Sequence, residues 1–195
     1  NGSAEVAIGG RRVTSNGSVN VSPAFTPGGA LAVASAFSGD TDIYLLGMGG
    51  QLMKNLTNSF GIDVNPSWSP DGSQFVFASE RAGKLHLFKS SGGGVERLTF
   101  VGSQNDNPNW SPKGDKIVFQ SMDGGWDIFV MNTDGSMIQR LTSTGGAESP
   151  TFAPNGRFIS FSQGGRVTLM REDGANPTPV GPGGSVQPAW GPAAK

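Results

Sequence analysis

Short apolar runs separated by glycine- and proline-rich turns recur along the chain, and no window repeats apolar residues at helical spacing. The clearest runs are Gln74–Ser79 and Lys116–Ser121 in the middle of the sequence. They are apolar at successive positions rather than at alternate ones, as in strands that are covered on both faces. The pattern predicts an all-β fold in which each sheet is sandwiched between two others.

Each run follows a copy of one motif: proline, any residue, Trp or Phe, a small residue and a second proline. The copies begin at five marker prolines, which are Pro23, Pro66, Pro108, Pro150 and Pro188. Their spacing of about 42 residues lies in the range expected for the four-stranded blades of a β-propeller. After the marker strand, three further strand patterns follow in each complete repeat. The last of them ends in Leu-Thr in the first three repeats and is broken by prolines, at Pro177 and Pro179, in the fourth. The repeat therefore predicts a propeller with four strands in each blade.

We predict one β-propeller domain over residues 1–195, with about five blades visible. The complete repeats are residues 22–64, 65–106, 107–148 and 149–186. Residues 1–21 are predicted to form the outer strands of a closing blade and residues 187–195 its inner strand, so that both ends of the chain share a blade. Neither end supplies an equivalent of Gln74–Ser79. This leaves open a ring of about five blades with one incomplete blade, or part of a longer propeller.

Composition and charge narrow the function classes. The 31 glycines and 13 prolines exclude long helices. Fourteen basic and fifteen acidic residues are interspersed, for a formal net charge of −1, so neither nucleic acid nor insertion into a membrane is expected. The absence of cysteine excludes disulfides and thiolate chemistry. Because the chain starts at Asn1 without a visible secretion signal, we expect a processed or trimmed chain.

The repeat resembles the WD-like repeat of the TolB propeller family, most specifically in Asn65–Gly72, Asn107–Gly114, Asp127–Met131 and Arg140–Thr142. In that family a six-bladed propeller follows an α/β domain, works in the bacterial periplasm as part of the Tol-Pal system of the cell envelope, and binds the peptidoglycan-associated lipoprotein Pal. The resemblance therefore implies a periplasmic or secreted protein with a protein partner. This chain departs from the family in lacking the α/β domain and in having only about five countable blades.

Propellers usually bind their partners at the mouth of the central channel, where loops lead into the inner strands. In this chain those loops carry amide, hydroxyl and carboxylate groups, on Asn20, Ser22, Asp63, Asn65, Asn105, Asp106, Asn107, Glu148, Ser149 and Gln187. Such groups suit hydrogen bonding to a partner, or holding a water or a hard cation in the channel. No cofactor is otherwise expected. The alternative is that the polar residue before each proline only caps a turn.

Other conspicuous side chains are better explained by packing. The aromatic residue two positions after each marker proline, such as Trp110, recurs with the blade and predicts packing between blades. Trp126 lies outside that series and is the better candidate for an exposed contact. His86 is the only histidine, and we align it with Tyr44, Phe129 and Thr168 of the third strands, which also predicts packing. Without a second histidine or a cysteine, no zinc site is expected.

Three functions remain open at this point. The leading hypothesis is a non-enzymatic scaffold that binds a protein partner, with recognition of a Pal-like lipoprotein as its most concrete form. The second is a structural protein whose open blade edges pair with copies of the same chain. The third is a lyase or hydrolase that uses the channel mouth, or the propeller of a peptidase whose catalytic part lies elsewhere. The first is favoured because the sequence shows no catalytic constellation.

Overall fold

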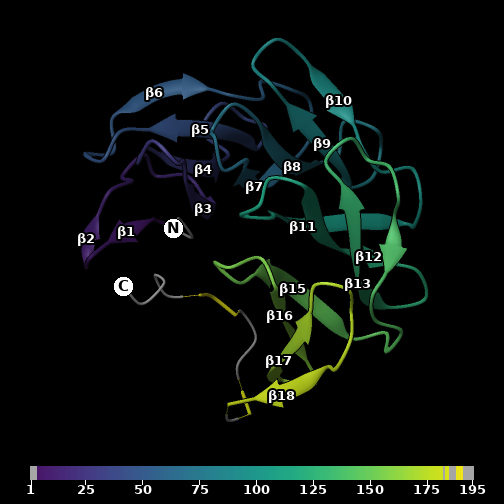
Figure 1. Cartoon of the computed structure of the whole chain (residues 1–195). Coiled ribbons are helices and arrows are strands. Elements are labelled where there is room, and N and C mark those ends of the chain that lie inside the picture. Colours follow the sequence, from purple (N-terminus) through teal and green to yellow (C-terminus); the bar gives the residue numbers. More distant parts are fainter. Residues whose placement is uncertain (1–3, 182, 185–187, 191–195) are drawn as a thin grey trace.

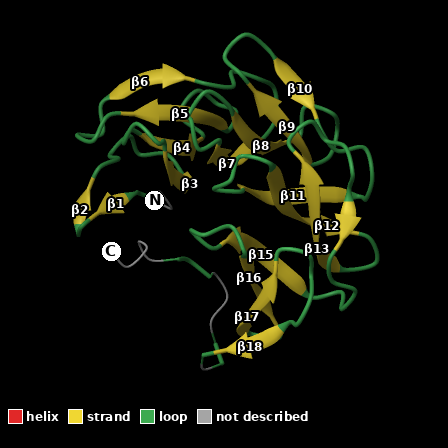
Figure 2. Cartoon of the chain, in the orientation of Figure 1, coloured by secondary structure: helices red, strands yellow, loops and turns green. Residues whose placement is uncertain are grey.

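The computed structural model describes residues 4–181, 183–184 and 188–190 (Figure 1, Figure 2). In this part of the chain eighteen strands form five antiparallel sheets, four of them with four strands and one with two. The same part holds no helix that could span a membrane. The prediction of an all-β fold is confirmed.

Each four-stranded sheet is one blade and is built from consecutive strands. Blade 1 contains β3 (Asn20–Phe25), β4 (Leu31–Ser35), β5 (Asp42–Leu46) and β6 (Leu52–Asn55). Blade 2 contains β7 (Asp63–Trp68), β8 (Phe75–Ser79), β9 (His86–Ser90) and β10 (Val95–Arg97). Blade 3 contains β11 (Gln104–Trp110), β12 (Lys116–Met122), β13 (Trp126–Asn132) and β14 (Gln139–Arg140). Blade 4 contains β15 (Ala147–Phe152), β16 (Phe158–Gln163), β17 (Arg166–Arg171) and β18 (Thr178–Val180).

The blades are arranged around a common centre. Strand β3 contacts β7, β7 contacts β11, and β11 contacts β15, so the first strands of successive blades lie side by side. Figure 1 shows these four strands toward the middle of the molecule and β6, β10 and β18 at its outside. This is the arrangement of a β-propeller, and the predicted fold class is confirmed.

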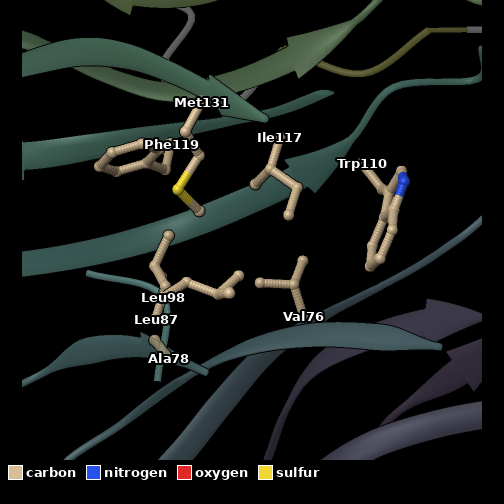
Figure 3. Close-up of a cluster of buried hydrophobic side chains, with 8 residues drawn as sticks. All are labelled: Val76, Ala78, Leu87, Leu98, Trp110, Ile117, Phe119 and Met131. Atoms are coloured by element: carbon tan, nitrogen blue, oxygen red, sulfur yellow. The ribbon is translucent and has the colours of Figure 1, made fainter. Parts of the chain in front are cut away.

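Hydrophobic side chains fill the spaces between blades. Between blades 2 and 3, Val76 and Leu87 face Ile117, Phe119 and Trp110 (Figure 3). Phe119 is fully buried, and burying a phenylalanine side chain contributes about 1.5–3 kcal/mol. On the other face of the same sheet, Val118 packs toward blade 4. The middle strands are therefore covered on both faces, as their continuous apolar runs predict.

The described residues before blade 1 and after blade 4 contact the blades next to them. Strands β1 (Ala7–Ile8) and β2 (Arg11–Arg12) form the two-stranded sheet, next to which Val6 and Val13 pack on Leu31 of blade 1. At the other end, residues 188–190 belong to no strand, but the indole nitrogen of Trp190 donates a hydrogen bond to the carbonyl of Thr151 on β15 (3.3 Å). A shared closing blade remains a prediction, since part of the C-terminal marker lies outside the described residues.

A recurring polar contact fixes the loop between one blade and the next. In blade 3 the Asp127 carboxylate accepts hydrogen bonds from Thr142 Oγ1 (2.6 Å) and from the backbone nitrogen of Thr144 (2.9 Å). Thr142 Oγ1 in turn accepts from the backbone nitrogen of Ile128 (2.9 Å). The equivalent pairs are Asp42 with Thr57 in blade 1 and Glu5 with Thr14 beside β1. We call this contact, between an acid at the start of the third strand and the threonine after the fourth, the Asp–Thr anchor.

His86 takes the place of the acid of this anchor in blade 2. It pairs with Ser79, as Asp42 pairs with Ser35 and Asp127 with Ser121, so its alignment with Tyr44 and Phe129 is wrong by two residues. The error arises because Leu85 packs on the core although it precedes β9, which makes the apolar run start too early. His86 therefore belongs to the contacts between blades rather than to the middle of a strand.

Candidate functional site

The residue before the marker proline has an unusual backbone conformation in all four blades. These residues have positive φ angles: Ser22 at 51°, Asn65 at 53°, Asn107 at 48° and Ser149 at 54°. The pairing of each first strand with the second strand also shifts at this point, which marks a β-bulge. A bulge accommodates a proline, which cannot donate a ladder hydrogen bond, and it turns the preceding side chain out of the regular alternation. The motif therefore places one polar side chain per blade on the channel wall.

These side chains link the blades through hydrogen bonds. The Ser22 hydroxyl donates to Asn65 Oδ1, and Asn65 Nδ2 donates to Asp106 Oδ1 (2.8 Å). The same Asp106 oxygen accepts from the backbone nitrogen of Asn107 (2.7 Å). Three blades thus contribute to one continuous chain of hydrogen bonds.

Gln120, on the second strand of blade 3, extends this chain to blade 4. Its Oε1 accepts hydrogen bonds from Asn107 Nδ2 (3.1 Å) and from the backbone nitrogen of Ser149 (2.7 Å). Gln120 was not among the residues predicted from the sequence. The available signal was an amide inside the apolar run Lys116–Ser121, because a buried polar side chain needs hydrogen-bond partners. We call the set Ser22, Asn65, Asp106, Asn107, Gln120 and Ser149 the polar ladder.

The polar ladder borders a cavity in the channel. This cavity has a volume of about 390 Å³ and is lined by Ser22, Asn65, Asn107 and Ser149, by their marker prolines, and by Pro188 and Ala189. A second cavity of about 530 Å³ shares Pro23, Pro66, Pro108 and Asn109 with it and continues along the channel toward the second prolines of the motif. The first cavity is thus bordered by the amide and hydroxyl groups of the polar ladder. The second is lined by prolines and aromatic rings together with further hydroxyl groups, such as those of Ser67 and Ser69.

Three of the predicted site residues are buried between blades instead of facing the channel. Asn20 is held by several groups that include the carbonyl of Ala4 (3.0 Å), and Asp63 forms an ion pair with Arg81 (2.9 Å). Asn105 donates to the carbonyl of Val101 (2.8 Å). Their polar groups are used to hold loops and neighbouring blades together.

The remaining predicted residues have different environments. Glu148 is exposed at the start of β15, next to Ser149 of the polar ladder. Gln187 lies outside the described residues. Trp126 is half-buried, and it forms a parallel bridge with Gly146 in the loop before β15. The structure thus brings together Ser22, Asn65, Asp106, Asn107 and Ser149, with Glu148 beside them.

The loops that lead into β7 and β11 carry exposed apolar residues that the sequence analysis missed. Phe60 is 88% exposed and Phe100 is 72% exposed, and each lies five to seven residues before the polar-ladder residue of its blade. Ile62 and Val101 in the same loops are also exposed. We call these four residues the apolar rim. The signal was their position in loops, where large apolar side chains have no core to join.

The described residues contain no group of three or more His, Asp or Glu side chains that could hold a metal ion. A cation in the channel would have to be bound mainly by amide and hydroxyl oxygens, because Asp106 supplies the single carboxylate of the polar ladder. The arrangement offers hydrogen-bond donors and acceptors in the channel, and exposed apolar side chains in the loops that precede β7 and β11. These are the groups found at protein-recognition surfaces.

Comparison with known proteins places the chain in a family. The family model described as the TolB beta propeller domain matches residues 4–194. The chain belongs to the TolB propeller family. It is 36% identical to the Tol-Pal system protein TolB of Bordetella pertussis in an alignment over 162 residues. This alignment covers 78% of the present chain and 37% of the Bordetella protein. The chain spans between 16% and 37% of the length of the curated relatives that it matches.

Solved structures show how widely this fold is used. The TolB structure from Acinetobacter baumannii matches 89% of this TolB-family chain and 46% of its own length, with 29% identity and a TM-score of 0.75. The structure of an oligogalacturonate lyase from Vibrio parahaemolyticus matches 85% of the chain and 54% of its own length, with 17% identity and a TM-score of 0.67. At that identity the likeness to the lyase shows the fold alone.

The positive φ of Asn65 makes a testable contribution to this TolB-family propeller. Replacing Asn65 by alanine or by glycine removes the same hydrogen bonds to Ser22 and Asp106, but only alanine keeps a Cβ in the left-handed conformation. We expect Asn65→Ala to be less stable than Asn65→Gly by about 1 kcal/mol in urea unfolding. Equal stabilities would show that the backbone relaxes at the bulge.

Proposed function

We propose that this chain is a non-enzymatic binding propeller that takes a protein partner at the mouth of its channel, as part of the Tol-Pal system in the bacterial periplasm. The observation that carries the proposal is the polar ladder with the apolar rim beside it. Membership of the TolB family supports the role of a binding protein, and the name of the Bordetella relative connects that role to the Tol-Pal system.

The mouth suits a folded protein or a peptide better than a small ion. Specific protein interfaces combine a few exposed aromatic anchors with polar groups of fixed orientation. Phe60 and Phe100 supply such anchors on neighbouring blades. The polar ladder supplies the fixed groups, because Ser22, Asn65 and Asp106 are oriented by side-chain bonds between blades. Asn107 is oriented by its bond to Gln120 within blade 3. A partner that enters the channel would therefore meet donors and acceptors that need little reordering.

The position of the single histidine favours binding over catalysis. His86 is almost fully buried between blades 2 and 3, and its Nδ1 faces Asn105 and Thr99 instead of the channel. A general base must come within hydrogen-bond reach of its substrate. The carboxylates of the channel mouth, Asp106 and Glu148, lie on different blades, and Asp106 is engaged in the polar ladder.

The proposal is tested by titrating the chain with the soluble domain of a Pal-type lipoprotein in a calorimeter. We expect binding with a dissociation constant that rises at least roughly tenfold in the variant Glu148→Lys, which reverses a charge at the mouth. Glu96→Lys is the matched control, since Glu96 lies on the outer strand β10, where its exposed side chain forms an ion pair with Lys89. It should bind like the wild type.

Two results would contradict the proposal. The first is the absence of heat and of co-elution with the lipoprotein domain, together with no partner recovered from periplasmic extract. The second is an equal loss of affinity in both lysine variants, which would place the interface away from the channel mouth.

A further inference from the structure

His86 is the one titratable imidazole in the chain, and it occupies a position where blades 1 and 3 have an aspartate. Its Nδ1 lies 3.0 Å from Asn105 Nδ2 and 3.5 Å from Thr99 Oγ1. Thr99 Oγ1 accepts a hydrogen bond from the backbone nitrogen of Leu87 (2.9 Å), as the threonine does in each Asp–Thr anchor. Because an amide nitrogen only donates, Nδ1 is the acceptor and the neutral ring carries its proton on Nε2.

Asn105 connects this histidine to the channel mouth. The same amide nitrogen that faces His86 donates a hydrogen bond to the carbonyl of Val101 (2.8 Å). Asn105 Oδ1 is buried and has no hydrogen-bond partner among the described residues. Val101 belongs to residues 99–103, the loop that carries Phe100 of the apolar rim. One amide group therefore holds both the imidazole and this loop.

Protonation of His86 makes this arrangement unfavourable. A proton on Nδ1 would face the amide N–H of Asn105, so that two donors meet. Turning the amide over would bring Oδ1 to the imidazolium, where it can accept a hydrogen bond. The same turn would break the bond from Asn105 Nδ2 to the carbonyl of Val101 and place two oxygens against each other. The protonated state can thus be satisfied only if Val101 moves away.

We propose that His86 and Asn105 form a proton-sensitive latch that holds residues 99–103 at the channel mouth and releases them when His86 is protonated. The charged groups that act on the ring are Arg97 and Lys84, both cations. Burial, followed by these two charges, lowers the pKa of His86 from its ordinary value of 6.5. The latch is therefore closed near neutral pH, where His86 is neutral, and it opens as the pH falls through the lowered pKa of His86.

The latch is a property of the chain without a partner. It is measured by the opening of residues 99–103 in the isolated chain, so its test is independent of the proposed function. If the channel mouth binds a protein, release of residues 99–103 would also displace Phe100 and lower the affinity in mildly acidic solution.

Amide hydrogen exchange combined with NMR titration of the single histidine tests the latch. Between about pH 7.5 and pH 5, after correction for intrinsic exchange, we expect the opening of residues 99–103 in the wild type to increase roughly tenfold as His86 titrates, about the effect of one hydrogen bond to a charged group. Residues 142–146, which the Asp127 anchor holds, serve as the internal reference and should not change. In His86→Gln, whose side chain can accept from Asn105 but cannot titrate, residues 99–103 should show no dependence on pH.

Each contrary result overturns the latch. These results are unchanged exchange of residues 99–103 across the titration, an equal increase in residues 142–146, and a pH dependence that persists in His86→Gln. The wild-type measurements decide the matter even if the variant does not fold.

Discussion

Replacing Asp127 by alanine is expected to lower the free energy of unfolding by about 3 kcal/mol. The carboxylate is 1% exposed and accepts hydrogen bonds from Arg140 (2.6 Å), Thr142 (2.6 Å) and the backbone nitrogens of Thr144 (2.9 Å) and Gly145 (3.2 Å). Its loss leaves these donors without their acceptor and frees the loop that leads from blade 3 to blade 4. The effect lies at the lower end of the range for a broken buried pair, because Arg140 is 39% exposed and can reach water. Urea unfolding at neutral pH measures it.

The matched control for this variant is Asp134→Ala in the same blade. Asp134 lies in the turn after β13, where it accepts a local bond from the backbone nitrogen of Ser136 (2.9 Å), and the control should leave the urea midpoint unchanged. Equal midpoints for the two variants would show that the anchor contributes nothing to stability.

The stabilising effect of Asp127 should also depend on pH. Burial raises the pKa of its carboxyl, but the hydrogen bonds from Thr142, Arg140, Thr144 and Gly145 together outweigh burial and hold the pKa below the ordinary value of 3.8. A group with a lowered folded pKa stabilises the protein above its unfolded pKa, and the effect is lost as the pH falls through the folded pKa. The difference in stability between wild type and Asp127→Ala should therefore shrink in acid.

The sequence predicted the fold because the repeat contains its own architecture. Trp110 packs between blades 2 and 3, and Phe152 packs between blades 3 and 4, as their recurrence indicated. The pattern failed at Phe25, which holds the equivalent place in blade 1 but is 56% exposed. The recurring aromatic residue is buried only where a preceding four-stranded blade covers it, and blade 1 follows only the two-stranded sheet of β1 and β2.

The candidate site was harder to predict because neighbouring polar residues in one strand have opposite surroundings. Asn105 and Asn107 are two positions apart, yet Asn105 is buried between blades whereas Asn107 joins the polar ladder. The bulge at the proline separates their environments, and its φ angles cannot be read from residue types. Gln120 and Phe60 were missed for another reason, since both lie outside the motif. Gln120 joins the polar ladder only through the arrangement of blades 3 and 4, and Phe60 is exposed in the loop before β7.

The second large effect concerns the apolar rim. The double variant Phe60→Ala and Phe100→Ala is expected to weaken binding of the Pal-type lipoprotein domain about 100-fold, or about 3 kcal/mol, which is typical of losing two exposed aromatic anchors. Phe100 also packs under Arg97, whose guanidinium lies 4.7 Å from the ring centre, so its loss frees a cation at the rim. The fold should keep its stability within about 0.5 kcal/mol, because both side chains are largely exposed.

Phe158→Ala is the matched control for the rim variant. Phe158 is also partly exposed, at 42%, but it begins β16 after the turn at the far end of the channel. We expect the affinity of Phe158→Ala for the lipoprotein domain to equal that of the wild type. If the double variant binds normally, the partner does not use the rim. If Phe158→Ala weakens binding as much as the double variant does, the interface is not confined to the apolar rim and includes blade 4.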